Sequence, residues 1–587
     1  MHDDRSADAV GARPAAPLPM PASAPGAPAA RPAGPIQLPP APPGLMTLRV
    51  NGKDHFVDPG KYRSLIEALR DLGHDIPHFC YHPGLSLDGN CRICCVNVID
   101  ARSGRPVTTT DLAAQPPRSY PKPVIACREP LDPRGMVVET ETAAVIQARK
   151  WVMEFFLINH PLDCPVCDKA GECILQDYSY AHGPADSRFH ERKNEKPPRD
   201  LGPTIRLWTD RCILCRRCTR FLQEVSGTGE LYVVERGDRS EIDAAPGRPV
   251  DNPIMGNIVD ICPVGALIDK DLMFTYRAWY LQRTDSVCPT CAAGCNIQVQ
   301  AQRQFVRRLV PRENREVNGW WMCDRGRKDF GYVNSPERLV HAQLDGEARP
   351  VGEAAEEAGR RLFRAARTDP ASVAGLCSAW LTLEELHLFR TLFRDVLKCE
   401  QIGLLAEPDG QELKFPKFRI EADNNPNRAG ARLVLGPDAE TRAARILAAA
   451  RSGALKALYL VCCMPHYRPP PEMRQALARV PLLIVQQLRA GPLLEQARIV
   501  LPGTSFAEKD GVFVNCRRRA QLVRRAIDPI PEGWDDLAVL QAVLRGAGAP
   551  ARSVSAGEVF REMTSIYPEL AGLTRQKLGR LGVALGS

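Results

Sequence analysis

The first elements with a clear pattern lie between residues 47 and 73. Two short runs rich in β-formers flank Asn51-Gly52, a dipeptide typical of a tight hairpin, so residues 47–57 predict two paired strands. Residues 64–72 carry apolar side chains at helical spacing, and Gly73 is suited to follow the end of a helix. A hairpin and a helix followed by a cysteine-rich loop predict a small ferredoxin-like domain of the β-grasp type.

A second pattern begins at Thr142. Apolar residues at helical spacing predict a helix over residues 142–159, and the polar, proline-rich residues 183–203 predict a loop. From about Pro350 helical and strand-like runs alternate, which predicts a largely parallel sheet with helices on both faces. The expected helices are 352–367, 383–397, 440–452 and 535–546, and the expected strands are 373–377, 432–435, 456–462, 482–486 and 498–502.

Composition limits the class of protein. The 587 residues exceed one ordinary domain several-fold, and residues 1–45 are so rich in proline and alanine that we expect a disordered tail. No apolar run approaches the roughly 20 residues that cross a membrane, and the N-terminal residues lack the apolar stretch of a secretory signal. A net charge of +8 is mild for this length and does not indicate nucleic-acid binding.

Cysteine is the informative residue type. The chain has 21 cysteines, and 16 of them lie between Cys80 and Cys323, many at short spacings. An odd total in a chain without an export signal argues against a disulfide framework. Concentration at short spacings in a reducing compartment therefore predicts metal binding.

The first candidate set is Cys80, Cys91, Cys94 and Cys127. Thiolates that converge from loops hold iron–sulfur clusters, and four are enough for a [2Fe-2S] unit. A polar loop inserted over residues 101–122 separates Cys94 from Cys127, so Cys95 is an alternative fourth ligand. Adjacent residues of a strand point to opposite faces, which favours Cys127 as the ligand and an inward Cys95.

The second set is His160, Cys164, Cys167 and Cys173. Structural zinc sites more often use two well-separated pairs of ligands, whereas these four residues fall within 14 positions. Close spacing suits a [4Fe-4S] cluster. An imidazole in place of a thiolate leaves a cluster less negative and should raise its reduction potential.

Two further sets each combine three close cysteines with a distant one. They are Cys212, Cys215, Cys218 and Cys262, and then Cys288, Cys291, Cys295 and Cys323. Both suit [4Fe-4S] clusters, and a four-cysteine zinc site is the alternative for the last set. Four arginines surround the third set, where they either offset the charge of a cluster or form a solvated basic face: Arg211, Arg216, Arg217 and Arg220.

Six cysteines fall outside these sets, and we expect them to be small buried hydrophobic residues. They are Cys95, Cys377, Cys399, Cys462, Cys463 and Cys516. Cys462 and Cys463 are adjacent in a predicted strand and have no further cysteines nearby in the sequence.

Longer motifs carry a resemblance to a known family. They are Pro77-His-Phe-Cys-Tyr-His-Pro-Gly-Leu-Ser86, Gly89-Asn-Cys-Arg-Ile-Cys94, Asn159-His-Pro-Leu-Asp-Cys-Pro-Val-Cys-Asp168, Gly171-Glu-Cys173, Gly256-Asn-Ile-Val-Asp-Ile-Cys-Pro-Val-Gly-Ala-Leu267 and Cys323-Asp-Arg-Gly-Arg327. With these motifs residues 46–340 resemble the large iron–sulfur subunit of NADH:quinone oxidoreductase, respiratory complex I. Residues 501–515 look like the molybdopterin-oxidoreductase-type domain that such subunits carry at the C-terminus.

The resemblance implies an α+β multidomain protein with one [2Fe-2S] cluster and three [4Fe-4S] clusters in the four sets above. The implied domains are a [2Fe-2S] ferredoxin-like domain (46–141), a His/Cys3 [4Fe-4S] module (142–182), a ferredoxin-like [4Fe-4S] module (183–282), an additional [4Fe-4S] module of the molybdopterin-enzyme type (283–340) and a truncated molybdopterin-oxidoreductase-like α/β domain (341–587).

The implied function is electron relay. By the resemblance, electrons pass from a flavin- and NADH-oxidising subunit through this chain to quinone-side iron–sulfur subunits. The implied place is the peripheral arm on the cytoplasmic side of the bacterial inner membrane, and the whole complex couples the reaction to proton translocation. The cluster of the fourth set matches one found only in some bacterial members, off the main route.

The chain also departs from this pattern. Its C-terminal domain is short for one that buries a bis-pterin molybdenum cofactor. The only candidate thiol ligands for molybdenum are Cys377, at the end of an apolar strand, and Cys399, after a helix. We therefore expect no molybdenum and interpret the domain as a scaffold. No GxGxxG motif follows a strand, so the chain should not oxidise NADH alone. Two alternatives stay open at this point: an electron-input subunit of an NAD-linked hydrogenase or formate dehydrogenase, and a zinc-rich assembly scaffold.

Overall fold

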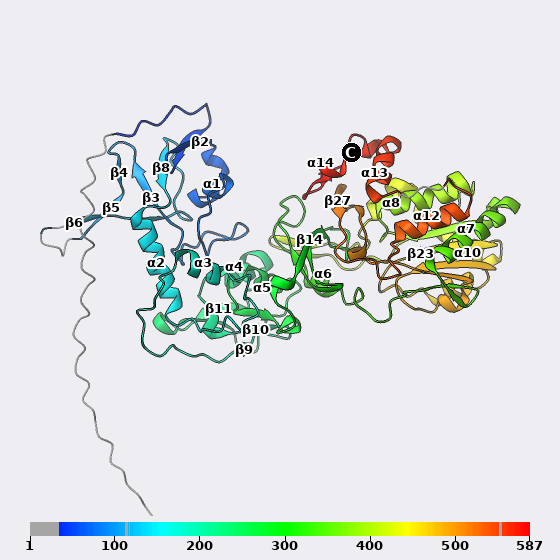
Figure 1. The fold of residues 1–587 in the computed structure, drawn as a ribbon, viewed down its shortest axis with the longest axis horizontal. Coiled ribbons are helices and arrows are strands. Elements are labelled where there is room, and N and C mark those ends of the chain that lie inside the picture. The colour runs from blue at the N-terminus through cyan, green and yellow to red at the C-terminus, as the bar shows by residue number, and fades with distance from the viewer. Residues whose placement is uncertain (1–34, 112–115, 117, 551–553, 587) are drawn as a thin grey trace, which may run out of the picture. The chain divides into compact units, whose positions relative to one another are not determined.

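The computed structural model describes residues 35–111, 116, 118–550 and 554–586 (Figure 1). The chain divides into two compact units, one of Met1–Pro77 with Arg92–Trp151 and the other of His78–Cys91 with Val152–Ser587. Among the described helices, none has the length and apolar character needed to cross a membrane.

The expected disordered tail lies outside the described residues up to residue 34. Residues 35–45 form neither helix nor strand, yet they form hydrogen bonds with the rest of the first unit. The Ile36 amide donates to the Ala101 carbonyl at 2.7 Å, and the Thr47 hydroxyl donates to the Pro39 carbonyl at 2.7 Å. These last residues before Met46 therefore contact the domain, contrary to the expectation of disorder up to residue 45.

The first unit is built on a mixed sheet with strand order β2-β1-β8-β3-β4. The elements are β1 (Met46–Val50), β2 (Lys53–Val57), α1 (Leu65–Asp71), β3 (Cys95–Asp100), β4 (Arg105–Pro106), β7 (Val124–Ile125) and β8 (Met136–Glu139). Asn51 and Gly52 have φ of 48° and 82°, as a two-residue hairpin turn requires. The predicted strand pair and helix are confirmed. The inserted residues 101–122 are not only a loop, because β5 (Thr108–Asp111) and β6 (Arg118–Pro121) pair within them.

The cysteine modules consist of short elements joined by loops. They are α2 (Ala143–Leu157), α3 (Ile174–His182), β9 (Arg199–Asp200), β10 (Ile205–Leu207), α4 (Arg217–Phe221), β11 (Leu231–Val234), β12 (Glu241–Ala244), α5 (Asn257–Ile261), β13 (Leu267–Asp269), β14 (Gln282–Val287), β15 (Asn296–Gln302), β16 (Phe305–Pro311) and α6 (Asp324–Lys328). The helix expected over 142–159 is confirmed as α2. Residues 183–203 are a loop, as predicted, apart from the two residues of β9.

A seven-stranded sheet, ordered β18-β17-β25-β24-β23-β19-β20, organises the C-terminal part. Its strands are β17 (Ala342–Leu344), β18 (Glu347–Arg349), β19 (Val373–Ser378), β20 (Ile402–Leu405), β23 (Ala457–Cys462), β24 (Leu482–Gln487) and β25 (Ile499–Pro502). The five strands from β25 to β20 are parallel, which confirms the predicted largely parallel sheet.

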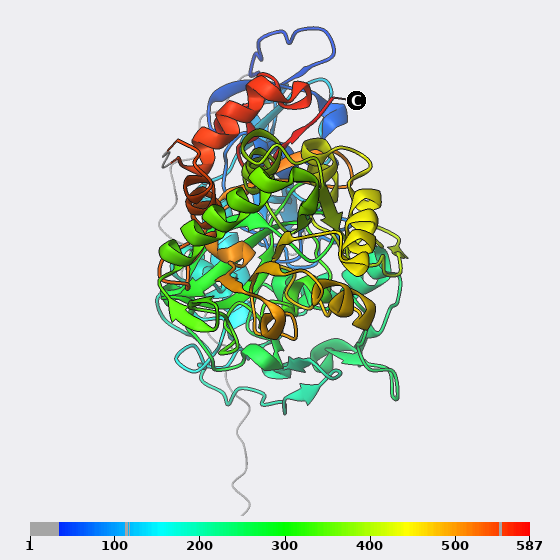
Figure 2. The ribbon, with the colours of Figure 1, turned by 90° about the vertical axis from the view of Figure 1, so that its right-hand side faces the viewer.

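Helices cover both faces of this sheet (Figure 1 and Figure 2). On one face α7 (Val351–Thr368), α8 (Leu383–Thr391), α12 (Asp536–Gly546) and α13 (Ala556–Ile566) share a core with alternate strand residues such as Tyr459. On the other face α10 (Ala439–Ser452) and α11 (Pro471–Leu477) pack against the intervening residues, such as Leu458. The smaller elements are β21 (Leu413–Phe415), β22 (Phe418–Ile420), β26 (Gly511–Val514), β27 (Arg519–Val523), α14 (Arg575–Leu578) and β28 (Val583–Ala584).

The strand predicted over residues 432–435 is wrong. These residues end a helix, α9 (Arg428–Leu435), whose buried positions include Gly430, Ala431, Val434 and Leu435. That spacing places the buried residues on one side of a helix. A four-residue apolar run cannot distinguish a strand from the end of a short amphipathic helix.

Candidate metal centres

The third set surrounds a single cavity. Cys212, Cys215, Cys218 and Cys262 all line it, next to apolar side chains such as Ile242. Cys218 lies in α4 and Cys262 follows α5, so two short helices and the loop before α4 hold the sulfurs. Burial raises the pKa of Cys212 to about 12 and that of Cys215 to about 11. Crowded thiols in such an environment ionise when a bound metal offsets their charge, so the set fits a metal–sulfur centre.

The fourth set is also buried and compact. Each of its cysteines, Cys288, Cys291, Cys295 and Cys323, is at most 7% exposed. The Cys288 amide donates to the Cys295 carbonyl at 2.9 Å, which closes the loop between β14 and β15. The Gly326 amide donates to the Cys323 sulfur at 3.3 Å. A larger residue at Gly326 would require a sulfur to move, because a Cβ at this position would lie 2.9 Å from the Cys288 sulfur and 3.4 Å from the Cys323 sulfur.

The second set lies closer to the surface. His160, Cys164 and Cys173 line one cavity, Cys164 is exposed, and Cys167 and Cys173 are buried. Burial lowers the pKa of His160 to about 4, so the imidazole is neutral near pH 7, which is the form that binds metals. Within the described part of the chain its Nδ1 is buried and has no hydrogen-bond partner. An orphaned imidazole nitrogen beside cysteines fits a metal ligand.

The absence of a side chain at Gly265 leaves space for the Cys167 sulfur of the second set. A Cβ added to Gly265 would lie 2.2 Å from the Cys167 sulfur, so no larger residue fits there without movement of the cysteine. The Cys173 thiol lies 3.8 Å from the Pro263 carbonyl. The second set is therefore packed against the Cys-Pro loop of the third.

The first set is divided between the two units. Cys80 and Cys91 are in the second unit, where the amides of Phe79 and Cys80 each donate to the Cys91 sulfur at 3.4 Å. Amide donors to a sulfur are typical of loops that hold iron–sulfur clusters. Cys94 and Cys127 are in the first unit and are 0% and 1% exposed.

The pairing of β3 with β7 explains how Cys127 comes close to Cys94 despite the insertion between them. Cys95 lies opposite Ile125, and the Ala126 amide donates to the Cys94 carbonyl at 3.0 Å. The sulfur of Cys95 itself lies 3.9 Å from the Val145 carbonyl and is buried, as predicted for an inward side chain. Cys127 rather than Cys95 therefore stays the predicted fourth ligand.

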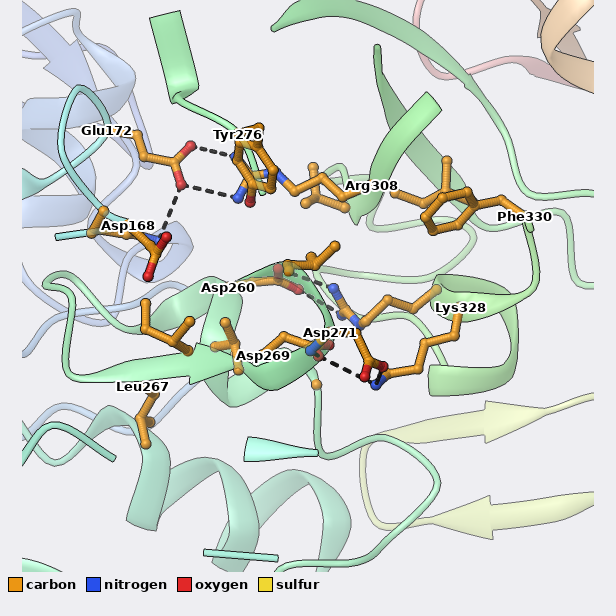
Figure 3. A pocket seen from close by; sticks show the side chains of 18 residues that line it. Asp168, Glu172, Asp260, Leu267, Asp269, Asp271, Tyr276, Arg308, Lys328 and Phe330 are labelled. Atoms are coloured by element: carbon orange, nitrogen blue, oxygen red, sulfur yellow. Dashed lines mark hydrogen bonds and ion pairs between the residues drawn. The ribbon is translucent and has the colours of Figure 1, made fainter. Parts of the chain in front are cut away.

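Ion pairs line a cavity of about 140 Å³ between the second, third and fourth modules (Figure 3). Glu172, next to Cys173, accepts from Arg308 at 3.0 Å. Arg327, in α6, pairs with Asp260 at 2.6 Å, two residues before Cys262. Lys328 pairs with Asp271 at 2.7 Å. These ion pairs connect residues of the three modules.

Across the described ranges, no three His, Cys, Asp or Glu side chains lie close enough together to bind a single metal ion.

The structure also decides between the two interpretations of the arginines around the third set. Arg211, Arg217 and Arg220 are 2%, 5% and 8% exposed, so these three do not form a solvated basic face, whereas Arg216 is only half-buried and pairs with Asp88. Arg211 pairs with Asp163 at 2.7 Å. The burial of these arginines could not be predicted from the sequence, because the carbonyl groups that Arg217 and Arg220 contact lie on segments distant in the sequence.

The cysteines outside the four sets behave as predicted with one exception. Cys95, Cys377, Cys399, Cys462 and Cys463 are buried. Cys516 is exposed, which corrects the prediction for that residue, because it follows the end of β26 in a turn.

Five family models match the chain in an order that follows the four sets. They are a 2Fe-2S iron-sulfur cluster binding domain (48–130), an NADH-ubiquinone oxidoreductase-G iron-sulfur binding region (149–188), an NADH-quinone oxidoreductase subunit 3 ferredoxin-like domain (202–268), a molybdopterin oxidoreductase Fe4S4 domain (281–335) and a molybdopterin oxidoreductase model (424–545). A subunit of the NADH-quinone oxidoreductase of Rickettsia felis is 33% identical over 360 residues, which cover 60% of this chain and 49% of the relative.

Over about half of its length this chain is similar to the family of the large iron–sulfur subunit, the 75 kDa subunit, of NADH-quinone oxidoreductases. The mitochondrial NADH dehydrogenase [ubiquinone] iron-sulfur protein 1 of Solanum tuberosum is 41% identical over 267 residues, 46% of this chain and 34% of that protein. The chain thus spans about half the length, or less, of the curated relatives it matches. A crystal structure of an NAD+-reducing [NiFe]-hydrogenase aligns at 27% identity over 39% of this chain and 90% of that chain, with a TM-score of 0.32, too low to indicate a shared fold.

The five matched family models confirm the predicted fold class. The chain carries a 2Fe-2S domain, several 4Fe-4S-binding regions and a molybdopterin-oxidoreductase-type α/β domain. The exact ligand residues and the number of clusters stay predictions, as do the domain boundaries.

A substitution at His160 tests the second set. We expect His160→Cys to keep a cluster and to lower its reduction potential, on the order of 100 mV, because a thiolate adds negative charge where the imidazole is neutral. Redox titration followed by EPR measures this shift. His190→Cys, at an exposed histidine, is the control and should leave the potential unchanged. An unchanged potential in His160→Cys would show that His160 is not a ligand.

Proposed function

We propose that this chain is the electron-relay subunit of a proton-translocating NADH:quinone oxidoreductase. In this proposal Cys80, Cys91, Cys94 and Cys127 hold a [2Fe-2S] cluster, and the other sets hold [4Fe-4S] clusters: His160, Cys164, Cys167 and Cys173; Cys212, Cys215, Cys218 and Cys262; and Cys288, Cys291, Cys295 and Cys323. When bound, such clusters accept and donate single electrons. The chain's own contribution is to hold them in order and to set their potentials through ligand type, charge and burial.

The third set carries this proposal, because all four of its cysteines line one cavity although Cys262 lies 44 residues beyond Cys218. Arg217 Nη1 donates to the Ile261 carbonyl at 3.1 Å and so links α4 to the residue before Cys262. Folding therefore assembles the distant ligand rather than leaving it in a separate segment. A complete set of this kind fits a resident cluster.

The surface of the second module supports a proposal about where electrons leave the chain. Cys164 is exposed, and large apolar side chains near it in the sequence and on α2 and α3 are open to solvent: Phe155 at 75%, Leu162 at 87% and Tyr180 at 87%. Exposed apolar side chains that gather around one module are typical of an interface with another protein. We propose that a quinone-side iron–sulfur subunit covers this surface, while the flavin subunit delivers electrons elsewhere on the chain. The site of action would be the peripheral arm, on the cytoplasmic side of the bacterial inner membrane.

The C-terminal domain fits a scaffold role better than a molybdenum site. Burial raises the pKa of Cys399 to about 11 and raises that of Cys377 further. The Cys399 thiol donates to the Val373 carbonyl at 2.7 Å, so its sulfur is engaged within the core. Both thiols are ordinary buried side chains rather than ligands that face an open site.

The function is tested on the native assembly, purified anaerobically with its partner subunits. Addition of NADH should reduce the EPR-visible clusters of the assembly. The isolated chain should be reduced by dithionite and not by NADH, because its sequence carries no recognisable nicotinamide-binding motif. Reduction of the native assembly by hydrogen or formate, and not by NADH, would favour the hydrogenase or formate dehydrogenase alternative.

A further inference from the structure

Arg217 is a buried cation without a carboxylate partner. Its side chain is 5% exposed, and none of the ion pairs among the described residues involves it. Neighbouring arginines differ in this respect, because Arg211 pairs with Asp163, Arg216 with Asp88 and Arg327 with Asp260. A buried charge is costly unless an opposite charge or several hydrogen bonds offset it. The surroundings of Arg217 must therefore supply negative charge of another kind.

The two ends of the Arg217 guanidinium contact loops that belong to different sets. Nη2 donates to the Tyr81 carbonyl at 2.6 Å, one residue after Cys80. Nη1 donates to the Ile261 carbonyl at 3.1 Å, one residue before Cys262. One side chain thus holds the Cys80 loop of the first set against the Cys262 loop of the third, across 136 and 44 positions of sequence.

The ionisable groups that Arg217 faces are cysteine side chains, which become negatively charged when they bind a metal. Its attractive interactions are with Cys215 and Cys262 of the third set and with Cys91 and Cys80 of the first. Arg220 supports the same loop from the side, because it donates to the carbonyls of Cys80 and Ser86. A thiolate-ligated cluster on each side would provide the negative charge that no carboxylate supplies.

We propose that Arg217 is a positioning residue shared by two iron–sulfur clusters, which fixes their ligand loops together and raises the reduction potentials of both. The proposal rests on the ligand sets of the proposed function. Reduction adds a negative charge to a cluster, and a nearby fixed positive charge stabilises the reduced form. Because the guanidinium is shielded from water, its field is weakly screened on both sides. The two potentials therefore depend on one side chain.

The test is a redox titration of the native assembly, followed by EPR, for the wild type, Arg217→Gln and Arg217→Lys. In Arg217→Gln the midpoint potentials of the first and third clusters should both fall, by about tenfold in the reduction equilibrium constant, which is 59 mV for a one-electron couple. In Arg217→Lys, which keeps the charge, both shifts should be clearly smaller. The cluster of the second set serves as an internal reference. Arg236→Gln, at an exposed arginine of the same module, should shift no midpoint.

The following results would contradict the inference. Unchanged midpoints in Arg217→Gln, or a shift confined to one cluster, would show that the two clusters do not share the charge. An equal shift in the lysine variant would show that the charge of this side chain does not set the potentials. If Arg217→Gln fails to retain the clusters, the lysine variant decides alone: signals at wild-type midpoints support the inference, and lost or displaced signals contradict it. Absence of the signals from the wild-type assembly would instead reject the ligand sets themselves.

Discussion

Replacing Lys509 with methionine should lower the free energy of unfolding of the C-terminal domain by about 3–5 kcal/mol. Lys509 is 2% exposed, and its Nζ lies 2.5 Å from Asp536 Oδ2 and 3.3 Å from Glu385 Oε2. Burial alone would lower the pKa of Lys509, but the two carboxylates raise it above its ordinary value, so the amine stays charged. Methionine keeps the volume and removes the charge, which leaves two buried carboxyl groups without a cation.

Urea unfolding followed by fluorescence measures the loss for Lys509→Met beside the wild type. The loss should be larger at pH 8 than at pH 5. Burial already raises the pKa of Glu385 to about 7 although Lys509 lowers it, so removal of the amine raises this pKa further, and the stability of the variant falls as the pH rises toward it. Lys456→Met, at an exposed lysine, should stay within about 0.5 kcal/mol of the wild type. A Lys509→Met protein as stable as this control would show that the ion cluster is not what holds the domain.

Replacing Cys262 with alanine should remove one whole cluster and stop electron relay. Cys262 lines the third cavity and follows α5, whereas Cys218 lies in α4 and the other two cysteines lie in the loop before α4. Three remaining thiolates leave one iron of a [4Fe-4S] cluster without its protein ligand. We expect about four fewer iron atoms per chain, and NADH-to-quinone electron transfer in the assembled complex should fall to background.

Iron analysis and NADH:quinone activity of the purified complex measure the effect of Cys262→Ala. Cys516→Ala is the matched control, because Cys516 is exposed and belongs to none of the four sets. The control should keep all of its iron and its activity. Full iron content in Cys262→Ala, or loss of iron from Cys516→Ala as well, would contradict the assignment of the third set.

Local features of the fold could be predicted from the sequence. Asn51-Gly52 predicts a two-residue hairpin, and the close spacing of Cys212, Cys215 and Cys218 predicts a metal-binding loop without information from the rest of the chain. Long amphipathic helices such as α7 show their period over enough residues to be recognised. The four-residue run at 432–435 was too short for this, and only the packing of α9 against its neighbours decides its structure.

The environment of the candidate site could not be predicted in the same way. The burial of Arg217 depends on the carbonyls of Tyr81 and Ile261, which are distant in the sequence and present no side-chain pattern. The proximity of Cys127 to Cys94 depends on the pairing of β3 with the two residues of β7, which no periodicity indicates. Motif spacing therefore predicts candidate metal ligands, whereas charge compensation and cavity shape appear only in the folded chain.

The most direct test of the central claim is a count of iron, acid-labile sulfide and zinc in the full chain purified without oxygen, with an EPR spectrum after reduction by dithionite. Four complete ligand sets predict about 14 iron atoms and as many sulfides per chain, little zinc, and signals from both two-iron and four-iron clusters. About four zinc atoms with little iron, in a sample without colour or signal, would contradict the account.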